Sequence, residues 1–466
     1  MSTFSGLNAA TTALWAQRRA LDVTGQNIAN VNTEGYSRQR ADLQALGGNP
    51  VPAFFSTSPG IGSGVSAEDV VRIRDAFLES RGHTEHANGA RLAAEADSLE
   101  LVEAAFREPG DTGIQSLLSD VWSGFEEVGN QPKDDAARAL VLQRLETLVG
   151  GLHFSSDSLS AQFDQTRENL GVLVKDVNAA ASTVAELNQA IQRATQSGVP
   201  SNDLADRRDV LIMKLADQVG ATVRHRDDGV LDVIVGGMSL VAGSTASEFA
   251  LAGSTDPATV ASDPPRIVTA VGGYTVRADG TAGGQLNALN TILPGYLTAL
   301  NGIASGLATD LNLAHKAGFD PTGAQGVDIL GSSSGPVTAA SIKVSITNPQ
   351  LIAASSMGLG IASLDHGNAQ KIAAMRDSTT GVDANYRRMI VELGVQASVT
   401  NRNVDIQAVI STQVDAARES VAGVNIDEEM TNMLSFQHAY SAAARMVTAI
   451  DETLDTLINR TGLVGR

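Results

Sequence analysis

Both ends of the chain carry a heptad pattern, which needs a partner helix or a core surface to cover its apolar side. Near the N-terminus, steps of three and four residues give Phe4, Leu7, Thr11, Leu14, Arg18, Leu21 and Ile28. The C-terminal series is more apolar and gives Met433, Phe436, Tyr440, Ala443, Val447, Ile450, Leu454, Leu457 and Val464, interrupted by the polar Thr461. Two arrangements fit this pattern: a coiled coil between the two ends, or two separate helices on a common core.

The charges of the two ends slightly favour the coiled coil. Residues 1–40 hold four Arg against Asp22 and Glu34, whereas residues 425–466 hold six acidic residues against three Arg. The two ends therefore attract each other weakly.

The middle of the chain predicts a long helix. Between Pro132 and Gly198 the sequence is almost free of helix breakers and keeps an apolar spacing of three and four. An unbroken helix over 134–197 would be ~96 Å long, although we expect a kink or break at Gly150-Gly151. Further helices are predicted at about 86–108, 112–128, 203–219, 285–316, 366–376, 383–420 and 427–459.

Three other segments differ in composition from the predicted helices. Residues 221–283 are rich in Gly, Ser, Thr and Val and include a predicted hairpin over 223–235. Residues 318–350 contain a strand-like run at 341–347, and residues 32–66 predict an extended loop or loose hairpin. The predicted fold is mainly α: a terminal-helix coiled coil plus an elongated helical bundle, with a small inserted β-rich domain. We expect three domains. The terminal coiled-coil domain with its extended loop comprises 1–66 and 421–466. The bundle comprises 67–220, 284–317 and 351–420, and the β-rich domain comprises 221–283 and 318–350.

Composition excludes several classes of function. Lys and Arg total 33 against 52 Asp and Glu, a net charge of −19, which argues against nucleic acid or an anionic membrane as a partner. The absence of Cys excludes disulfides, Cys-based metal sites and thiol nucleophiles. No apolar run is long enough to predict a membrane span, and the first residues show no signal peptide.

The catalytic and metal motifs are weak. His83 and His86 could begin a metal site, but a zinc site needs a third ligand and HExxH is absent. GSSSG at 331–335 matches G-x-S-x-G, yet Pro336 and a strand-like run follow where a nucleophile elbow needs a helix. GIGSG at 60–64 lacks the βαβ context of a dinucleotide loop. We therefore predict no enzyme, no metal and no cofactor.

The informative segment is NIANVNTEGYSRQ at 27–39, directly after the first stripe. Asn30, Asn32 and Gly35 supply the side-chain hydrogen bonds and left-handed backbone that end a helix and start a loop. As a whole string, the segment closely resembles the N-terminal signature of the bacterial flagellar axial proteins, the family of rod, hook and hook-associated subunits. Its ending GYSRQ is similar to the hook-associated members.

Further segments resemble the same family in the same order along the chain. They are the connector at 62–78, the stretch SNDLADRRDVLIMKLA at 201–216, the helix at 284–320 and the C-terminal signature at 420–458. GVNIDEE at 423–429 is the sharpest single piece. The resemblance covers both ends and most of the helical body, but little of 221–283 or 321–350.

The resemblance implies how these segments are used. Family members leave the cell through the flagellar type III route without a cleaved signal, and their terminal segments become ordered on assembly. The terminal helices then form an inner coiled coil, with the bundle outside it and the β-rich domain facing outward. The residues implied in subunit interaction are Leu7, Leu14, Leu21, Asn27, Ile28, Asn30, Asn32, Gly35, Tyr36, Arg38, Gln39, Gly423, Asn425, Asp427, Glu428, Glu429, Met433, Tyr440, Val447, Ile450, Leu454 and Leu457.

The implied function is a structural junction between flagellar hook and filament, outside the cell. Its partners would be the hook subunit, the second hook-associated protein and copies of itself in a ring, with an export chaperone on the C-terminal helix before assembly. Two alternatives are a hook or rod subunit and, from a different class, a secreted serine hydrolase that uses Ser333. The chain length, NDLADRRD at 202–209 and GVNIDEE favour the junction.

Overall fold

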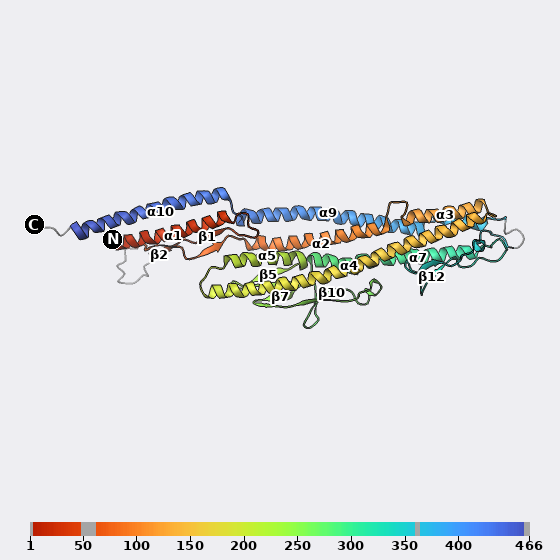
Figure 1. Ribbon diagram of the computed structural model, residues 1–466, viewed down its shortest axis with the longest axis horizontal. Helices are drawn as coiled ribbons and strands as arrows, with labels where there is room; N and C mark the ends of the chain where they lie inside the picture. Colours follow the sequence, from red (N-terminus) through yellow and green to blue (C-terminus); the bar gives the residue numbers. More distant parts are fainter. Residues whose placement is uncertain (1–2, 48–61, 359–363, 461–466) are drawn as a thin grey trace, which may run out of the picture.

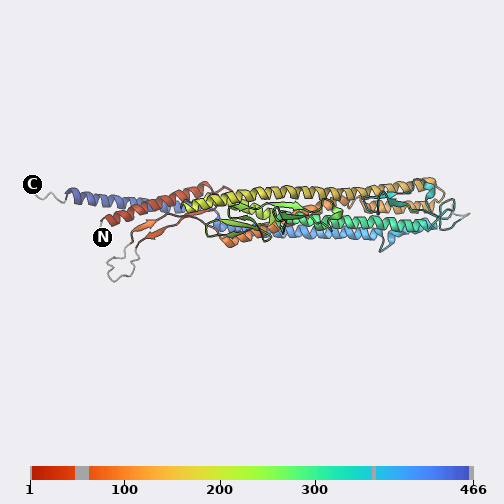
Figure 2. The same cartoon turned by 90° about the horizontal axis from the view of Figure 1, so that it is seen from below.

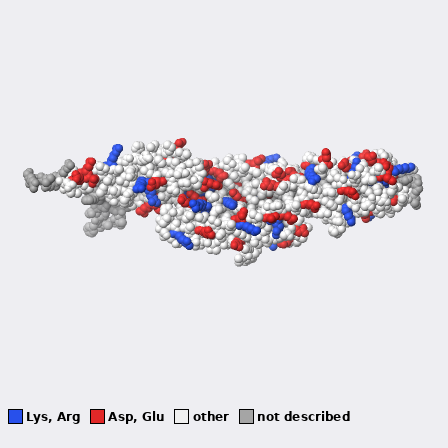
Figure 3. All heavy atoms as spheres, viewed as in Figure 1, with Lys and Arg blue, Asp and Glu red and all other residues white. Residues whose placement is uncertain are grey.

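Long helices lie side by side along one axis in the computed structural model and give the protein the shape of a rod (Figures 1 and 2). The structure describes residues 3–47, 62–358 and 364–460. The predicted stripe position Val464 lies outside the described residues, as do Thr461 and segment 48–61. Acidic and basic side chains are spread along the length of the rod (Figure 3). None of the helices in the described ranges is long and apolar enough to cross a membrane.

The helices agree with the mainly α prediction. In chain order they are α1 (Thr3–Ala29), α2 (Ala76–Phe106), α3 (Ile114–Asn130), α4 (Asp135–Gln196), α5 (Asn202–Val219), α6 (Gly280–Asn287), α7 (Leu293–Lys316), α8 (Gly367–Ala373), α9 (Val382–Ala422) and α10 (Ile426–Asp455). Two π-helical turns, Ala288–Ile292 and Thr456–Arg460, follow α6 and α10, and short 3-10 turns lie at Pro257–Thr259, Pro349–Leu351 and Ala374–Asp377.

The bundle core forms where α2, α3, α4, α7 and α9 pack together. Phe106 at the end of α2 stands edge-on to Tyr296 of α7 and Tyr386 of α9, with ring centroids 6.3 and 6.4 Å away. Trp122 of α3 is buried and donates from Nε1 to Asp383 of α9 over 2.8 Å. Burial of such large side chains from several helices fixes the bundle as one unit.

The predicted break at Gly150-Gly151 is wrong, because α4 continues uninterrupted through both glycines. A Cβ at Gly151 would lie 2.7 Å from Leu117 Cδ1, so this glycine lets α3 approach α4 closely. The buried neighbours Val149 and Leu152 hold the same turn in the core. Packing on both sides therefore outweighs the ~1 kcal/mol helix-propensity cost of each glycine.

Within the described ranges, the strands form small antiparallel sheets. Three of these are two-stranded: β1 (Gln39–Ala41) with β4 (Val70–Arg72), β2 (Gln44–Leu46) with β3 (Gly64–Ser66), and β12 (Leu330–Ser332) with β13 (Ile342–Val344). A four-stranded sheet contains β5 (Thr222–His225), β6 (Leu231–Val235), β7 (Met238–Ala242) and β8 (Thr245–Ala246), and a three-stranded sheet contains β9 (Phe249–Ala252), β10 (Arg266–Thr269) and β11 (Thr275–Val276). The predicted hairpin is confirmed, since Val223 pairs with Val233. The first two ladders form the predicted loose hairpin, which extends to Arg72.

The two β-rich segments do not form one domain, which corrects the grouping of 221–283 with 318–350. In the described part of the chain, β12 and β13 pair only with each other. They lie toward the far end of the bundle from the termini, whereas β5, β7 and β10 lie beside its middle (Figure 1). The β12–β13 hairpin is held to α4, because the Ile342 carbonyl oxygen lies 2.8 Å from His153 Nε2. Each segment therefore uses a different part of the bundle as its support.

The two terminal helices lie side by side beyond one end of the bundle (Figure 1). They are antiparallel, since Gly6 at the start of α1 lies against Ile450 near the end of α10, and Asn27 at the end of α1 contacts Glu429 at the start of α10. Among the described side chains of α1, the fully buried ones are small or polar: Ala10, Ala16, Ala20, Thr24 and Asn27. The terminal pair therefore has a thinner core than the bundle.

Candidate functional site

The two signature segments meet where the terminal helix pair joins the bundle. Asn27, buried at the end of α1, donates from Nδ2 to Glu429 Oε2 and to the Gln39 carbonyl, both over 2.9 Å. Its Oδ1 accepts from the Gln39 amide over 3.0 Å and from the Tyr36 hydroxyl over 2.9 Å. One amide side chain thus ties together segments about 400 positions apart in the chain.

Arg38 completes this group, which we call the signature cluster: Asn27, Tyr36, Arg38, Gln39 and Glu429. The Arg38 guanidinium lies 2.7 Å from Glu429 Oε1 and 2.8 Å from Glu428 Oε2. The Glu429 side chain is 3% exposed, whereas that of Glu428 is 58% exposed, so the two pairs differ in shielding from water. Burial, followed by the nearby carboxylates of Asp206, Asp203 and Glu429, raises the pKa of Tyr36 to about 12.

GVNIDEE shapes the break between α9 and α10. Asn425 caps α10, since its Oδ1 accepts from the amides of Asp427 and Glu428 over 3.0 and 3.3 Å. The acidic side chains of the first turn lie at the helix N-terminus, where the helix dipole favours negative charge. Gly423 ends α9 and donates to the Glu419 carbonyl. The segment is therefore a helix stop followed directly by a helix start.

The loop after α1 contains one glycine that no other residue can replace without strain. Gly35 has a φ of +75°, and a Cβ there would lie 2.2 Å from Val210 Cγ2 of α5. Asn30 donates from Nδ2 to the Gln26 carbonyl over 2.9 Å and accepts from the Thr33 hydroxyl, while Asn32 is exposed. The left-handed turn thus belongs to Gly35 and the local hydrogen bonds to Asn30.

A second charged group lies next to the first and was not picked out residue by residue from the sequence. Arg72 at the end of β4 lies 2.8 Å from both Asp206 and Asp209 of α5, and Arg74 also pairs with Asp209. We call these four residues the connector cluster. Burial lowers the pKa of Arg72, but Asp209 and Asp206 outweigh it and the pKa is raised. Their signal was the family-like stretches 62–78 and 201–216, which this cluster joins.

The two clusters are linked to each other. The Ser37 amide donates to Asp206 over 3.3 Å. Asn202 at the start of α5 donates from Nδ2 to Gln39 Oε1 over 3.1 Å and to the Val70 carbonyl over 2.9 Å. The chemistry of this site is charge pairing and amide hydrogen bonding, which fixes how the terminal pair sits on the bundle.

The heptad residues of α1 and α10 are only partly buried where the two helices meet. The residues at least partly covered are Leu7, Leu14, Leu21, Ile28, Met433, Val447, Ile450 and Leu454. Tyr440 and Leu457 are 39% and 52% exposed. Both side chains therefore keep a large exposed surface within one chain.

The weaker motifs have other roles. GSSSG begins within β12 and turns the chain back toward β13, with Ser332 Oγ bonded to the carbonyls of Ser334 and Pro336. His86 lies between Asp217 and Asp415, 3.3 and 3.0 Å from its ring nitrogens. No group of three or more His, Cys, Asp or Glu within the described ranges could hold a metal ion.

The whole chain is similar to curated flagellar proteins. It is 31% identical over 508 aligned residues to the flagellar hook-associated protein 1 of Bacillus subtilis (strain 168), covering 100% of both chains. The chain belongs to the flagellar hook-associated protein 1 family. A hook-associated protein 1 from Escherichia coli (strain K12) is 24% identical over 98% of each chain.

Family models match three segments that contribute to the site, whereas Arg38, Gln39, Arg72 and Arg74 lie between the matched ranges. The flagellar hook-associated protein FlgK helical domain matches residues 99–330. The C-terminal model of the flagellar basal body rod FlgEFG proteins matches 418–460, and the flagella basal body rod protein model matches 7–36. Among solved structures, the hook junction protein FlgK from Burkholderia pseudomallei has a TM-score of 0.64 and 16% identity, over 74% of this chain and 100% of that one. The two structures thus share a fold over about three quarters of this chain.

Proposed function

We propose that this protein is a non-enzymatic junction between the flagellar hook and the filament. The observation that carries the proposal is the full-length similarity to hook-associated protein 1, with the family signatures meeting at one joint. Its partners are the hook subunit on one side, the second hook-associated protein on the other, and copies of itself in a ring. An adapter of this kind needs two different surfaces. The terminal pair, two helices with a thin core, and the bundle, several tightly packed helices, provide them.

The domains of this adapter divide at the joint. Residues 1–66 with 421–466 form the terminal unit, and 67–220 with 284–317 and 351–420 form the bundle. The signature and connector clusters lie at the boundary between them. The predicted residues Asn27, Tyr36, Arg38, Gln39 and Glu429 therefore act within one subunit, by setting the angle at which the terminal unit meets its neighbours.

The site of action is the outside of the cell, after export through the flagellar type III route. Before assembly, α10 is held by an export chaperone. This is supported by the large apolar side chains that α10 exposes, among them Ile426, Met430, Leu434 and Met446. An amphipathic helix with such side chains aggregates unless a hydrophobic groove covers it.

The test is a deletion strain examined by electron microscopy and a swimming assay. We expect complete hooks, no filaments and flagellin released into the medium. Restoring the gene should restore swimming, and so should the Ser333→Ala variant, which removes the only serine chemistry suggested by the sequence. Full-length filaments on the deletion strain would reject the junction role.

The same strain distinguishes the closest alternative. A hook or rod subunit would leave cells without hooks, because assembly would stop earlier. Hooks of normal length without filaments are expected only from a protein that acts after the hook is complete. Loss of hooks in the deletion strain would therefore favour the alternative.

A further inference from the structure

The helix α9 is apolar on two opposite faces. Its inner face packs into the bundle through Tyr386, Met389, Leu393, Ala397 and Val414, all buried. Its outer face, which we call the α9 stripe, carries five large side chains that are 47–65% exposed: Val391, Val395, Val399, Ile406 and Val409. These positions fall within an arc of about 80° on a helix of 3.6 residues per turn. A helix that is apolar on both sides is normally covered on both sides.

The α9 stripe is long and poor in charge. From Val391 to Val409 it extends ~27 Å along the helix axis. Over that distance the sequence contains only three charged residues, Glu392, Arg402 and Asp405. Contiguous exposed apolar surfaces of this kind mark interaction sites on soluble proteins.

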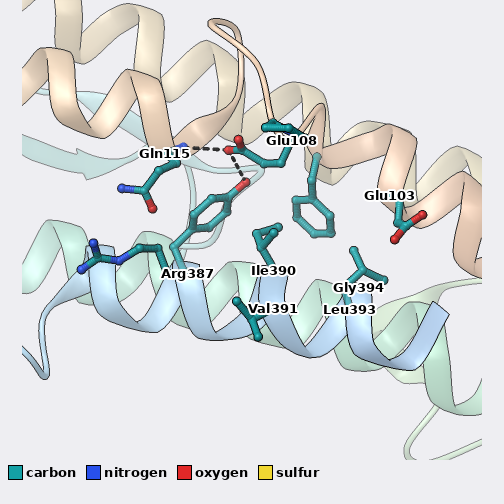
Figure 4. Close-up of a pocket in the computed structure, with 11 residues that line it drawn as sticks. Glu103, Glu108, Gln115, Arg387, Ile390, Val391, Leu393 and Gly394 are labelled. Carbon is teal, nitrogen blue, oxygen red and sulfur yellow. Dashed lines mark hydrogen bonds between the residues drawn. The ribbon is translucent and has the colours of Figure 1, made fainter. Parts of the chain in front are cut away.

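A pocket of about 450 Å³ lies at one end of the α9 stripe. Its walls come from the end of α2, the loop that follows, and the first turns of α9, including Phe106, Ile390, Val391 and Gly394. Figure 4 shows Ile390 on α9 pointing toward Glu108, which accepts a hydrogen bond from the Tyr386 hydroxyl over 3.1 Å, while Val391 lies at the rim of the pocket on the outer side of α9. The pocket is mainly apolar and large enough to take a bulky side chain.

The apolar surface continues beyond α9. The helix α10 follows end to end along the same edge of the rod (Figure 1) and exposes Ile426, Met430 and Leu434. From Val391 to Leu434 the two helices span ~65 Å. A partner that covers this edge must be elongated, as this chain is: its own α4 of 62 residues is ~93 Å long.

We propose that the α9 stripe and its pocket bind a second copy of this chain, side by side in the ring; this rests on the proposed function. Each copy carries a net charge of −19, so copies repel one another except where charge is sparse. The α9 stripe is such a surface. The contact is heterologous: the stripe of one copy meets a different face of the next, as the side-by-side copies of a ring require.

The test places a photo-crosslinking amino acid at Val395 or at Ile406 in the otherwise native chain. Asn401, exposed on the same helix but about 120° away from the stripe, is the matched control position. Hook–filament particles are isolated, irradiated and analysed by mass spectrometry. We expect cross-links between two copies of this chain from both stripe positions and none from position 401.

The outcomes separate this inference from the proposed function. Two results would overturn the inference and leave the junction role intact. One is particles that contain the chain but show no cross-links between its copies, and the other is cross-links from the stripe to a different protein. Particles without the chain would reject both. A second variant tests the energetics: Val395→Asp should reduce filaments per cell about tenfold or more, whereas Asn401→Asp should not. Normal filament numbers in Val395→Asp would also contradict the contact.

Discussion

At the scale of single residues, Arg38 pairs with two carboxylates that differ in their exposure to water. It pairs with both Glu428 and Glu429, at nearly equal distances, but only Glu429 is buried and also bonded to Asn27. The sequence indicated all four residues through the family signatures. It could not indicate that Asn27 and Arg38 share one carboxylate, because the two segments lie about 390 residues apart and only the antiparallel register of α1 and α10 brings them together.

We predict that Glu429→Gln loosens the docking of the terminal helices. Removing the charge of Glu429 weakens a buried, charge-assisted hydrogen bond while Glu428 still pairs with Arg38, which costs about 1–3 kcal/mol. The measurement is hydrogen exchange of the α1 and α10 amides, which should open more easily while the α3 and α4 amides are unchanged.

Glu428→Gln is the matched control for this prediction. Because that carboxylate is mostly in water, its loss should cost about 0–1 kcal/mol. Equal effects of the two variants would show that burial of Glu429 does not matter.

His86 gives the protein a pH dependence. Hydrogen bonds first to Asp217 and then to Asp415 raise the pKa of His86 from 6.5 to about 9, against the opposing effect of burial. The protonated form is therefore favoured in the folded protein, and its stabilisation is complete below pH 6.5 and lost as the pH rises through about 9. This residue joins α2, α5 and α9.

We expect the thermal midpoint to fall between pH 6.5 and 9 in the wild type, and to fall less in His86→Gln. His438→Gln, on the exposed side of α10, should behave like the wild type. Thermal melts monitored by circular dichroism across this range test the prediction. Parallel curves for wild type and His86→Gln would contradict the role of the histidine.

At the scale of elements, local rules predicted helices better than helix interruptions. The apolar spacing between Pro132 and Gly198 predicted α4 correctly. The Gly150-Gly151 pair suggested a break, because the sequence does not show that Leu117 of another helix fills the space above Gly151. The β-rich segments were predicted as strands but assigned to one domain, since nothing local in 330–344 shows which part of α4 it packs on.

The two glycines give a matched pair for testing this explanation. Gly150→Ala should stabilise the protein by about 0.5–1 kcal/mol, because no atom lies near the added methyl and Ala is the better helix former. Gly151→Ala should be no more stable than the wild type and up to ~2 kcal/mol less stable, since an overpacking cost of about 1–3 kcal/mol opposes the same gain. Chemical denaturation of both variants measures the difference. A larger gain at Gly151 than at Gly150 would contradict the close packing of α3 on α4.

At the scale of the whole molecule, the two units differ in how much they bury. The α3–α4 core buries Trp122, Phe125 and Phe163 completely, whereas the one fully buried side chain in the described part of α10 is Glu429. The sequence predicted both units from their stripes and from the family resemblance. It could not rank their stability, because the heptad leucines of α1 are only partly covered in one chain.

We predict that the terminal pair opens long before the bundle. Limited proteolysis with mass mapping should cut first up to about residue 40 and beyond about 425, while 134–197 resists, because a helix pair with a thin core loses its order at low free energy. Cleavage within α4 at the same rate as within α10 would contradict this order.

The three-residue break between α9 and α10 has a mechanical consequence. Two strands of backbone cross from the bundle to the terminal pair, one through residues 423–425 and one through the loop after α1, and Arg38 fastens them to each other. Because these contacts hold the joint on both sides, a torque applied to one end of the rod reaches the other end only through the two backbone crossings and the Arg38–Glu429 pair that ties them.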